Sequence, residues 1–212
     1  MTQTAVFRGD FEAHLTVRAD TDRLLALEAY AAERELKFAH IVLARGRVPQ
    51  QPMVTVRRSG TLAGVRTEVA EIAARLDADG FPVLRTKIEA TPWAEGVPST
   101  DEQAAVLGAH FYFEHHVKLL LAPDSGTTAI EAAARAHAAH LSANTRRVRP
   151  DSRLERFVTQ RCRGVGDLTA TVRLRALLAD LTGLDIASIE REFVVYDSNE
   201  SVDAGWIDEQ LL

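Results

Sequence analysis

The sequence predicts an α+β protein made of two copies of a βαββαβ unit, the ferredoxin-like arrangement, with two antiparallel sheets and helices on their outer faces. A strand motif occurs twice, as FEAHLTV at residues 11–17 and FEHHVKL at residues 113–119. The pattern Val-Thr-x-Arg-x-x-Gly also occurs in both halves, at residues 54–60 and 158–164. The separation between matching positions drifts only from 102 residues at the first strand to 106 at the last. Self-similarity of this kind indicates an internal duplication.

In the first half, the alternation and the helical spacing of apolar residues give the order β-α-β-β-α-β. Asp20 stands where it can cap the first predicted helix, and Gly80 follows the second helix, as is common at helix ends. The predicted strands cover residues 11–18, 37–44, 53–57 and 81–90, and the predicted helices cover residues 21–35 and 62–78.

The second half repeats this order. Its predicted strands cover residues 113–120, 143–149, 156–162 and 188–196; an Ala-rich helix is expected to end near His140, and another to cover residues 167–182. We therefore predict a first repeat at residues 1–92, a connector at 93–110, a second repeat at 111–200 and a tail at 201–212 that packs on the body.

Two features near the ends of the repeats concern packing. Trp93 and Trp206 leave the two repeats at matching points, and we expect both rings to pack against the ends of the sheets. The acidic residues of the tail are expected to face solvent; they are Asp197, Glu200, Asp203 and Asp208.

Composition excludes several classes of protein. The chain has 212 residues, of which 46% are hydrophobic and 26% charged, as is typical of a globular protein. A net charge of -5 argues against non-specific nucleic-acid binding. No apolar stretch approaches the ~18 residues of a membrane span, and no signal peptide is visible. The single cysteine, Cys162, excludes an internal disulfide and a zinc-thiolate site. We therefore expect a cytoplasmic protein with no membrane contact, and 22 Arg against 3 Lys is typical of a GC-rich bacterial genome.

The candidate site is the sheet face that the helices leave uncovered. Alternate residues of a strand share a face, so Glu12 and His14 point the same way, as do Glu114 and His116. The candidate catalytic residues are His14 and His116. The candidate ligand-binding residues are Glu12, Thr55, Arg57, Arg85, Lys87, Glu114, Lys118, Thr159, Arg161 and Arg191. In the alignment of the repeats, Arg85 corresponds to Arg191 and Glu89 to Val195.

These residue types favour an anionic ligand. Arg presents a planar fork that suits phosphate or carboxylate, and His can move a proton near neutral pH. We therefore predict that a small anionic ligand binds in a cleft between the repeats, and we expect no metal site. The sequence leaves the cofactor open, and it does not decide between a monomer and a homo-oligomer or between binding and catalysis.

Three short motifs resemble known families whose sites lie in a cavity between two facing modules. His14-Leu15-Thr16-Val17 resembles the His-x-Thr-x motif of two-histidine phosphoesterases, although the second half has Lys118 where that motif has Thr. Residues 114–118 are similar to the Glu-x-Glu-x-Lys signature of triphosphate-tunnel (CYTH) proteins, with His116 in place of a carboxylate expected to help bind metal. The duplicated modules with His14 and Glu89 also resemble vicinal-oxygen-chelate enzymes, and the Val195 alignment leaves their symmetric metal set incomplete.

Two alternatives stay open at this point. In the first, the chain is a non-catalytic interaction or structural module, and the Glu and Arg side chains pair between the repeats. In the second, it is a phosphoesterase-like hydrolase that uses the paired histidines. The ligand-binding hypothesis requires His14, His116, Arg57 and Arg161 to converge on an open cavity.

Overall fold

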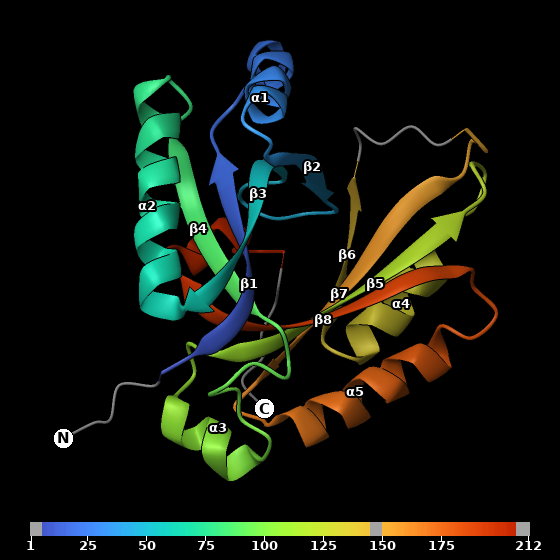
Figure 1. Cartoon of the computed structure of the whole chain (residues 1–212). Helices are drawn as coiled ribbons and strands as arrows, with labels where there is room; N and C mark the ends of the chain where they lie inside the picture. Colours follow the sequence, from blue (N-terminus) through green and yellow to red (C-terminus); the bar gives the residue numbers. More distant parts are fainter. Residues whose placement is uncertain (1–5, 145–149, 207–212) are drawn as a thin grey trace.

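The computed structural model describes residues 6–144 and 150–206 (Figure 1). The first repeat contains β1 (Arg8–Val17), α1 (Thr21–Glu33), β2 (Lys37–Leu43), β3 (Gln50–Thr61), α2 (Leu62–Ala78) and β4 (Val83–Ala90). The connector contains α3 (Asp101–Leu107). The second repeat contains β5 (Tyr112–Leu121), α4 (Thr128–Ala136), β6 (Ala139–Asn144), β7 (Leu154–Arg163), α5 (Asp167–Asp180) and β8 (Ile186–Asp197), and a short 3-10 helix, η1 (Glu200–Asp203), follows. The predicted α+β class and the duplicated βαββαβ unit are confirmed.

The eight strands form one closed barrel in the order β1-β3-β2-β6-β7-β5-β8-β4. Each repeat contributes four neighbouring strands with its first strand inside the set: β1 lies between β3 and β4, and β5 between β7 and β8. The two four-stranded sheets join along both edges, where β2 pairs with β6 and β4 pairs with β8. The sheets therefore face each other across an interior, an arrangement that the sequence had left open.

Apolar side chains pack outside the barrel, under the helices. Phe11, Ala13 and Leu15 of β1 are buried against the first pair of helices, and Val117 and Leu119 of β5 belong to a second core under α4 and α5. The apolar stripe of α2 faces this first core; its residues are Val65, Val69, Ile72 and Leu76. Figure 1 shows α1 and α2 on the outer side of one half and α4 and α5 on the outer side of the other. Because alternate residues of a strand face opposite ways, the polar residues of the same strands point into the barrel.

Side-chain caps set where three helices begin. Asp20 accepts a hydrogen bond from the Arg23 amide at the start of α1, and Thr61 accepts one from the Gly64 amide at the start of α2. Thr100 and Gln103 form a capping box at α3. Each cap satisfies a backbone N–H that has no partner within its helix.

Among the described residues, no helix is both long and apolar enough to cross a membrane.

The Ala-rich helix of the second repeat ends earlier than predicted. α4 stops at Ala136, and β6 already begins at Ala139, whereas the predicted strand began at residue 143. Ala138 has a φ of 51°, which breaks the helix. Residues 139–144 then pair with both β7 and β2, so sheet pairing overrides the helical propensity of Ala in this segment. The rest of the predicted strand, residues 145–149, lies outside the described residues.

Candidate functional site

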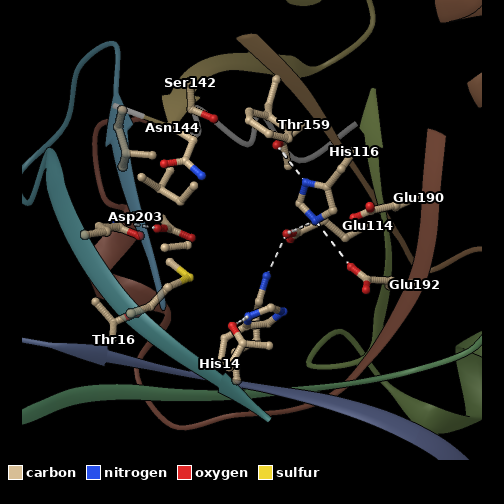
Figure 2. A pocket seen from close by; sticks show the side chains of 18 of the residues that line it. His14, Thr16, Glu114, His116, Ser142, Asn144, Thr159, Glu190, Glu192 and Asp203 are labelled. Carbon is tan, nitrogen blue, oxygen red and sulfur yellow. Dashed lines mark hydrogen bonds and ion pairs between the residues drawn. The ribbon is translucent and has the colours of Figure 1, made fainter. Parts of the chain in front are cut away.

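The barrel encloses a cavity of about 210 Å³ between the two repeats (Figure 2). Both imidazoles of the predicted site, His14 and His116, line it. The cationic residues of its wall are Lys37, Arg85, Lys87, Lys118 and Arg161, and the acidic residues are Glu12, Glu114, Glu190, Glu192 and Asp203. Thr16, Thr55, Ser142, Asn144 and Thr159 add neutral polar groups. The apolar residues of the wall are Ala39, Ile41, Leu43, Met53, Phe157 and Trp206. This chamber therefore differs from the apolar cores outside the barrel by its many charged side chains.

The two histidines are held in the same way in each repeat. His14 lies opposite Thr55, and its Nδ1 is 2.8 Å from Thr55 Oγ1. His116 lies opposite Thr159, and its Nδ1 is 3.0 Å from Thr159 Oγ1. In both repeats the hydroxyl fixes the ring and leaves Nε2 directed at carboxylates. The Val-Thr-x-Arg-x-x-Gly repeat in the sequence therefore marks the strand that holds the imidazole.

The carboxylates around the two Nε2 atoms come from both ends of each repeat. His14 Nε2 lies 2.8 Å from Glu89 Oε2. His116 Nε2 lies 3.2 Å from Glu114 Oε1 and 3.4 Å from Glu192 Oε2. Burial and the negative charge of Glu89 raise the pKa of Glu192 above its ordinary value. The acidic groups therefore outweigh the cations at this end of the cavity.

The predicted alignment of the fourth strands is wrong. Glu89 lies opposite Glu12, and Glu192 lies opposite Glu114, so Glu192 is the counterpart of Glu89. Arg191 points away from the cavity and donates to Asp167 and Thr171 of α5. The alignment failed because β8 has 12 residues against 8 in β4, so matching the strands by position along the chain shifted the register.

Lys87 connects the two repeats through their acidic residues. Its Nζ lies 2.6 Å from Glu89 Oε1 and 2.7 Å from Glu114 Oε1. Arg161 adds a second contact to Glu114, from Nε to Oε2 at 2.7 Å. Burial alone would raise the pKa values of Glu89 and Glu114, but the Lys87 ammonium brings both below the ordinary value. The two carboxylates are therefore ionised in a buried network that spans the repeats.

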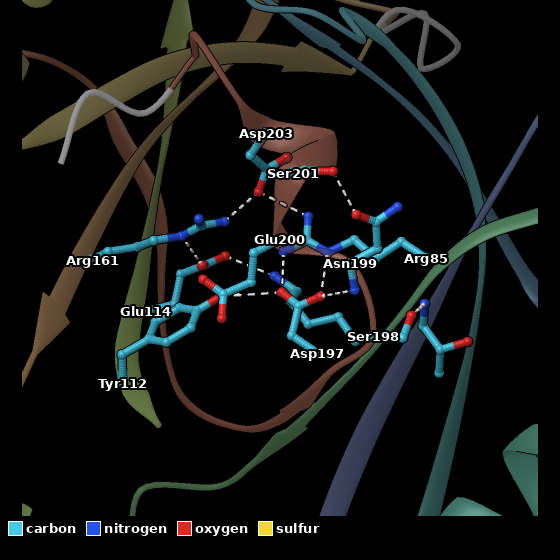
Figure 3. A network of polar contacts seen from close by, with 12 residues as sticks. Arg85, Tyr112, Glu114, Arg161, Asp197, Ser198, Asn199, Glu200, Ser201 and Asp203 are labelled. Carbon is cyan, nitrogen blue, oxygen red and sulfur yellow. Dashed lines mark hydrogen bonds and ion pairs between the residues drawn. The ribbon is translucent and has the colours of Figure 1, made fainter. Parts of the chain in front are cut away.

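A carboxylate from the C-terminal segment enters the same chamber (Figure 3). Asp203 of η1 accepts from Arg85 Nη1 at 2.8 Å, from Arg161 Nη2 at 2.5 Å and from Gln51 Nε2 at 3.0 Å. Arg85 also pairs with Asp197 at the end of β8. Burial would raise the pKa of Asp203, but Arg161 and Arg85 lower it. Asp203 therefore joins a guanidinium of each repeat.

This arrangement corrects two expectations about the tail. Asp197 and Asp203 were expected to face solvent, yet their side chains are only 1% and 3% exposed because the barrel arginines need acidic partners. Trp206 is buried as expected, and its Nε1 donates to the Leu141 carbonyl. Trp93 is 80% exposed, so its expected packing role is wrong. Asp208 lies outside the described residues.

Two further predicted residues lie near the edges of the chamber. Arg57 is 82% exposed and donates from Nε to Glu12 Oε2 at 2.6 Å; it lines a neighbouring surface hollow that also contains Glu12 and Trp93. Lys118 lines the cavity with its Nζ 3.8 Å from Glu155. Of the four residues that the ligand hypothesis requires, His14, His116 and Arg161 converge on the cavity, and Arg57 lies outside it.

The residues that sequence reasoning missed are Glu192, Glu190, Asp203 and Gln51. Glu190 and Glu192 alternate on β8 as Glu12 and His14 do on β1, so a search for period-two polar residues on that strand could have found them. Gln51 alternates with Met53 and Thr55 on β3, and it was missed because the predicted strand began at residue 53. No comparable signal marks Asp203, which follows the last strand.

We expect His116 to titrate far above ordinary histidines. Burial would lower its pKa, but hydrogen bonds to Glu114 and Glu192 raise it to about 10. Since the folded pKa exceeds the unfolded value, its contribution to stability is complete below about pH 6.5 and is lost as the pH rises through 10. NMR titration of the His116 ring should report this value, and Glu192→Gln should lower it by about 1 unit or more. A ring that titrates near pH 6.5 in the folded wild type would contradict this assignment.

Comparison with known proteins adds no family assignment. No family model matches the chain, and no curated protein matches it. Among solved structures, it is similar to the ligand-free regulatory subunit of aspartate kinase from Thermus thermophilus, at 12% identity and a TM-score of 0.34, over 85% of this chain and 99% of that chain. A likeness of this size carries no argument about the site.

Proposed function

We propose that the barrel interior binds a small anionic ligand that bears phosphate or carboxylate groups. The observation that carries this proposal is the coordination of Asp203. Its carboxylate is held by Arg85, Arg161 and Gln51 in the way that an arginine pair and an amide bind a free oxyanion. The protein thus already uses this wall of the chamber to hold one carboxylate.

The surroundings support the same chemistry. Lys118 reaches the cavity from β5, where its Nζ lies 3.8 Å from Glu155 and 5.2 Å from the centre of the Phe157 ring. Lys37 stands at the rim with 67% of its side chain exposed. His116, with a pKa of about 10, carries a proton at neutral pH and donates hydrogen bonds. Together these groups can add positive charge around a ligand that meets Arg85 and Arg161.

The size of the chamber limits the ligand. A volume of about 210 Å³ lies below the ~300 Å³ at which pockets for drug-sized molecules begin. Inorganic phosphate, short polyphosphates and small polycarboxylates are therefore better candidates than a large organic molecule.

Hydrolysis of a phosphoester is the second candidate function, and the placement of the two imidazoles favours it. His14 and His116 face the same cavity, each oriented by a threonine hydroxyl. The protonated His116 could donate its proton to a leaving oxygen as a general acid. Binding without turnover and hydrolysis both require the anion site, so binding is the first property to test.

The test is calorimetric titration with phosphate, pyrophosphate, tripolyphosphate and citrate at constant ionic strength. We expect at least one of them to bind, and Lys118→Gln to weaken that affinity by about tenfold, the loss of roughly 1.4 kcal/mol of charge-assisted hydrogen bonding. Arg34→Gln is the control, because it removes the same charge at the C-cap of α1, outside the barrel.

The outcomes separate the alternatives. Binding that Lys118→Gln weakens and Arg34→Gln does not supports the anion site. Release of phosphate from an added phosphomonoester, lost in His116→Gln, supports the hydrolase. No heat and no thermal stabilisation with any of the four anions would refute the proposal and favour a structural module, since ligands that bind only the native state stabilise it.

A further inference from the structure

A group of side chains with the spacing of metal ligands lies between the chamber and the neighbouring surface hollow. His14, Glu89 and Glu192 each offer one ligand atom, and these atoms lie within 4.8 Å of one another. They come from β1, β4 and β8, which are adjacent strands of the closed barrel. Only the joining of β4 to β8 brings Glu192, the second carboxylate, to the other two ligands.

The tautomer of His14 can suit a metal. When Nδ1–H donates to Thr55 Oγ1, at 2.8 Å, Nε2 is free to ligate. Metal-bound histidines almost always donate their other ring N–H to an oxygen in this way. Nε2 lies 2.8 Å from Glu89 Oε2, so one cation can contact both atoms.

A second group, made of Glu89, Glu114 and His116, has the same spacing. The Lys87 ammonium lies there, at 2.6 Å from Glu89 Oε1 and 2.7 Å from Glu114 Oε1. It neutralises that pair but leaves Glu89 Oε2 to His14. The lysine therefore already supplies the cation of the second group, and the first group is the one suited to an external ion.

We propose that His14 Nε2, Glu89 Oε2 and a carboxylate oxygen of Glu192 bind one divalent transition-metal ion. One imidazole with two carboxylates favours Zn²⁺, Co²⁺ or Mn²⁺ over Ca²⁺, which prefers oxygen ligands alone. Glu12, whose Oε1 lies 3.8 Å from His14 Nε2, stands next to this position. His14 and Glu192 also line the chamber, whereas Glu89 and Glu192 line the neighbouring surface hollow, so the ion would lie at the boundary between the two.

The test is titration of the full chain with Co²⁺, followed by visible absorption and calorimetry without any added anion. We expect one equivalent to bind at this site, and His14→Gln or Glu192→Gln to remove that equivalent. Thr55→Val should weaken the same equivalent by about 10–100-fold, as loss of the oxygen behind a metal-bound histidine does. Thr159→Val is the matched control, because it makes the same change behind His116 and should leave the affinity within a few-fold.

Thr55→Val keeps the test valid if His14→Gln or Glu192→Gln fails to fold, because it replaces only one hydroxyl in a side chain of nearly the same shape. Wild-type protein that binds no Co²⁺, or an equivalent that survives His14→Gln, would overturn the inference. Equal losses in Thr55→Val and Thr159→Val would overturn it too. Because these titrations contain no phosphate or carboxylate ligand, their failure leaves the test of anion binding independent.

Discussion

Lys87→Met should lower the free energy of unfolding at pH 7 by about 3–5 kcal/mol, the range seen when one partner of a buried ion pair is removed. The variant leaves the Glu89 and Glu114 carboxylates, 1% and 2% exposed, without the ammonium that contacts both. Methionine keeps most of the volume, so the loss reports charge more than packing. Urea unfolding followed by circular dichroism measures it.

The pH dependence distinguishes this explanation from a packing defect. Lys87 lowers the pKa values of Glu89 and Glu114, so its contribution to stability is complete above their ordinary value of 4.5 and is lost progressively as the pH falls from there through the lowered folded values. The gap between wild type and Lys87→Met should therefore narrow in acid. Lys37→Met is the control: its Nζ is 3.7 Å from Glu12 at an exposed position, and it should cost less than about 1 kcal/mol. A gap of the same size at pH 7 and pH 4 would show that the charge is not responsible.

The sequence predicted the repeat and the strand faces because both depend on short-range patterns. Alternation along β1 assigned Glu12 and His14 to one side and Phe11 and Leu15 to the other, and the structure places them so. The same reasoning brought Lys118 and Arg161 to the cavity. A strand with one apolar face has little freedom in which side it buries, since a slip of one residue would invert every side chain.

The parts that could not be predicted depend on contacts distant in the sequence. Closure of the barrel requires β4 to pair with β8, and this pairing brings Glu192 near Glu89. Arg191 was misplaced because β8 is longer than β4, and its pairing with β5, not its position along the chain, sets which residues face the cavity. Asp203 follows the last strand and enters the chamber only because Arg85 and Arg161 converge there.

Asp203→Asn should have two effects in opposite directions. It removes the charge that Arg85 and Arg161 share, and we expect a loss of about 2–5 kcal/mol in the free energy of unfolding, as for a buried charge pair that loses one partner. It also removes the carboxylate that an incoming anion must replace at the guanidinium groups. Added phosphate or citrate should therefore raise the melting temperature of the variant by more than it raises that of the wild type.

The comparison with Glu200→Gln separates loss of a neighbouring charge from loss of the internal anion. Glu200 lies on the same 3-10 helix and pairs with Arg163 at 2.7 Å. Its side chain is 35% exposed, and its carboxylate pairs with Arg163 rather than with Arg85 or Arg161. This variant should lose less than about 1 kcal/mol and respond to phosphate as the wild type does. If phosphate stabilised all three proteins equally, Asp203 would be a structural counter-ion only. A larger response confined to Asp203→Asn would mean that the carboxylate and the added anion bind the same pair of arginines, because only that variant leaves both guanidinium groups without it.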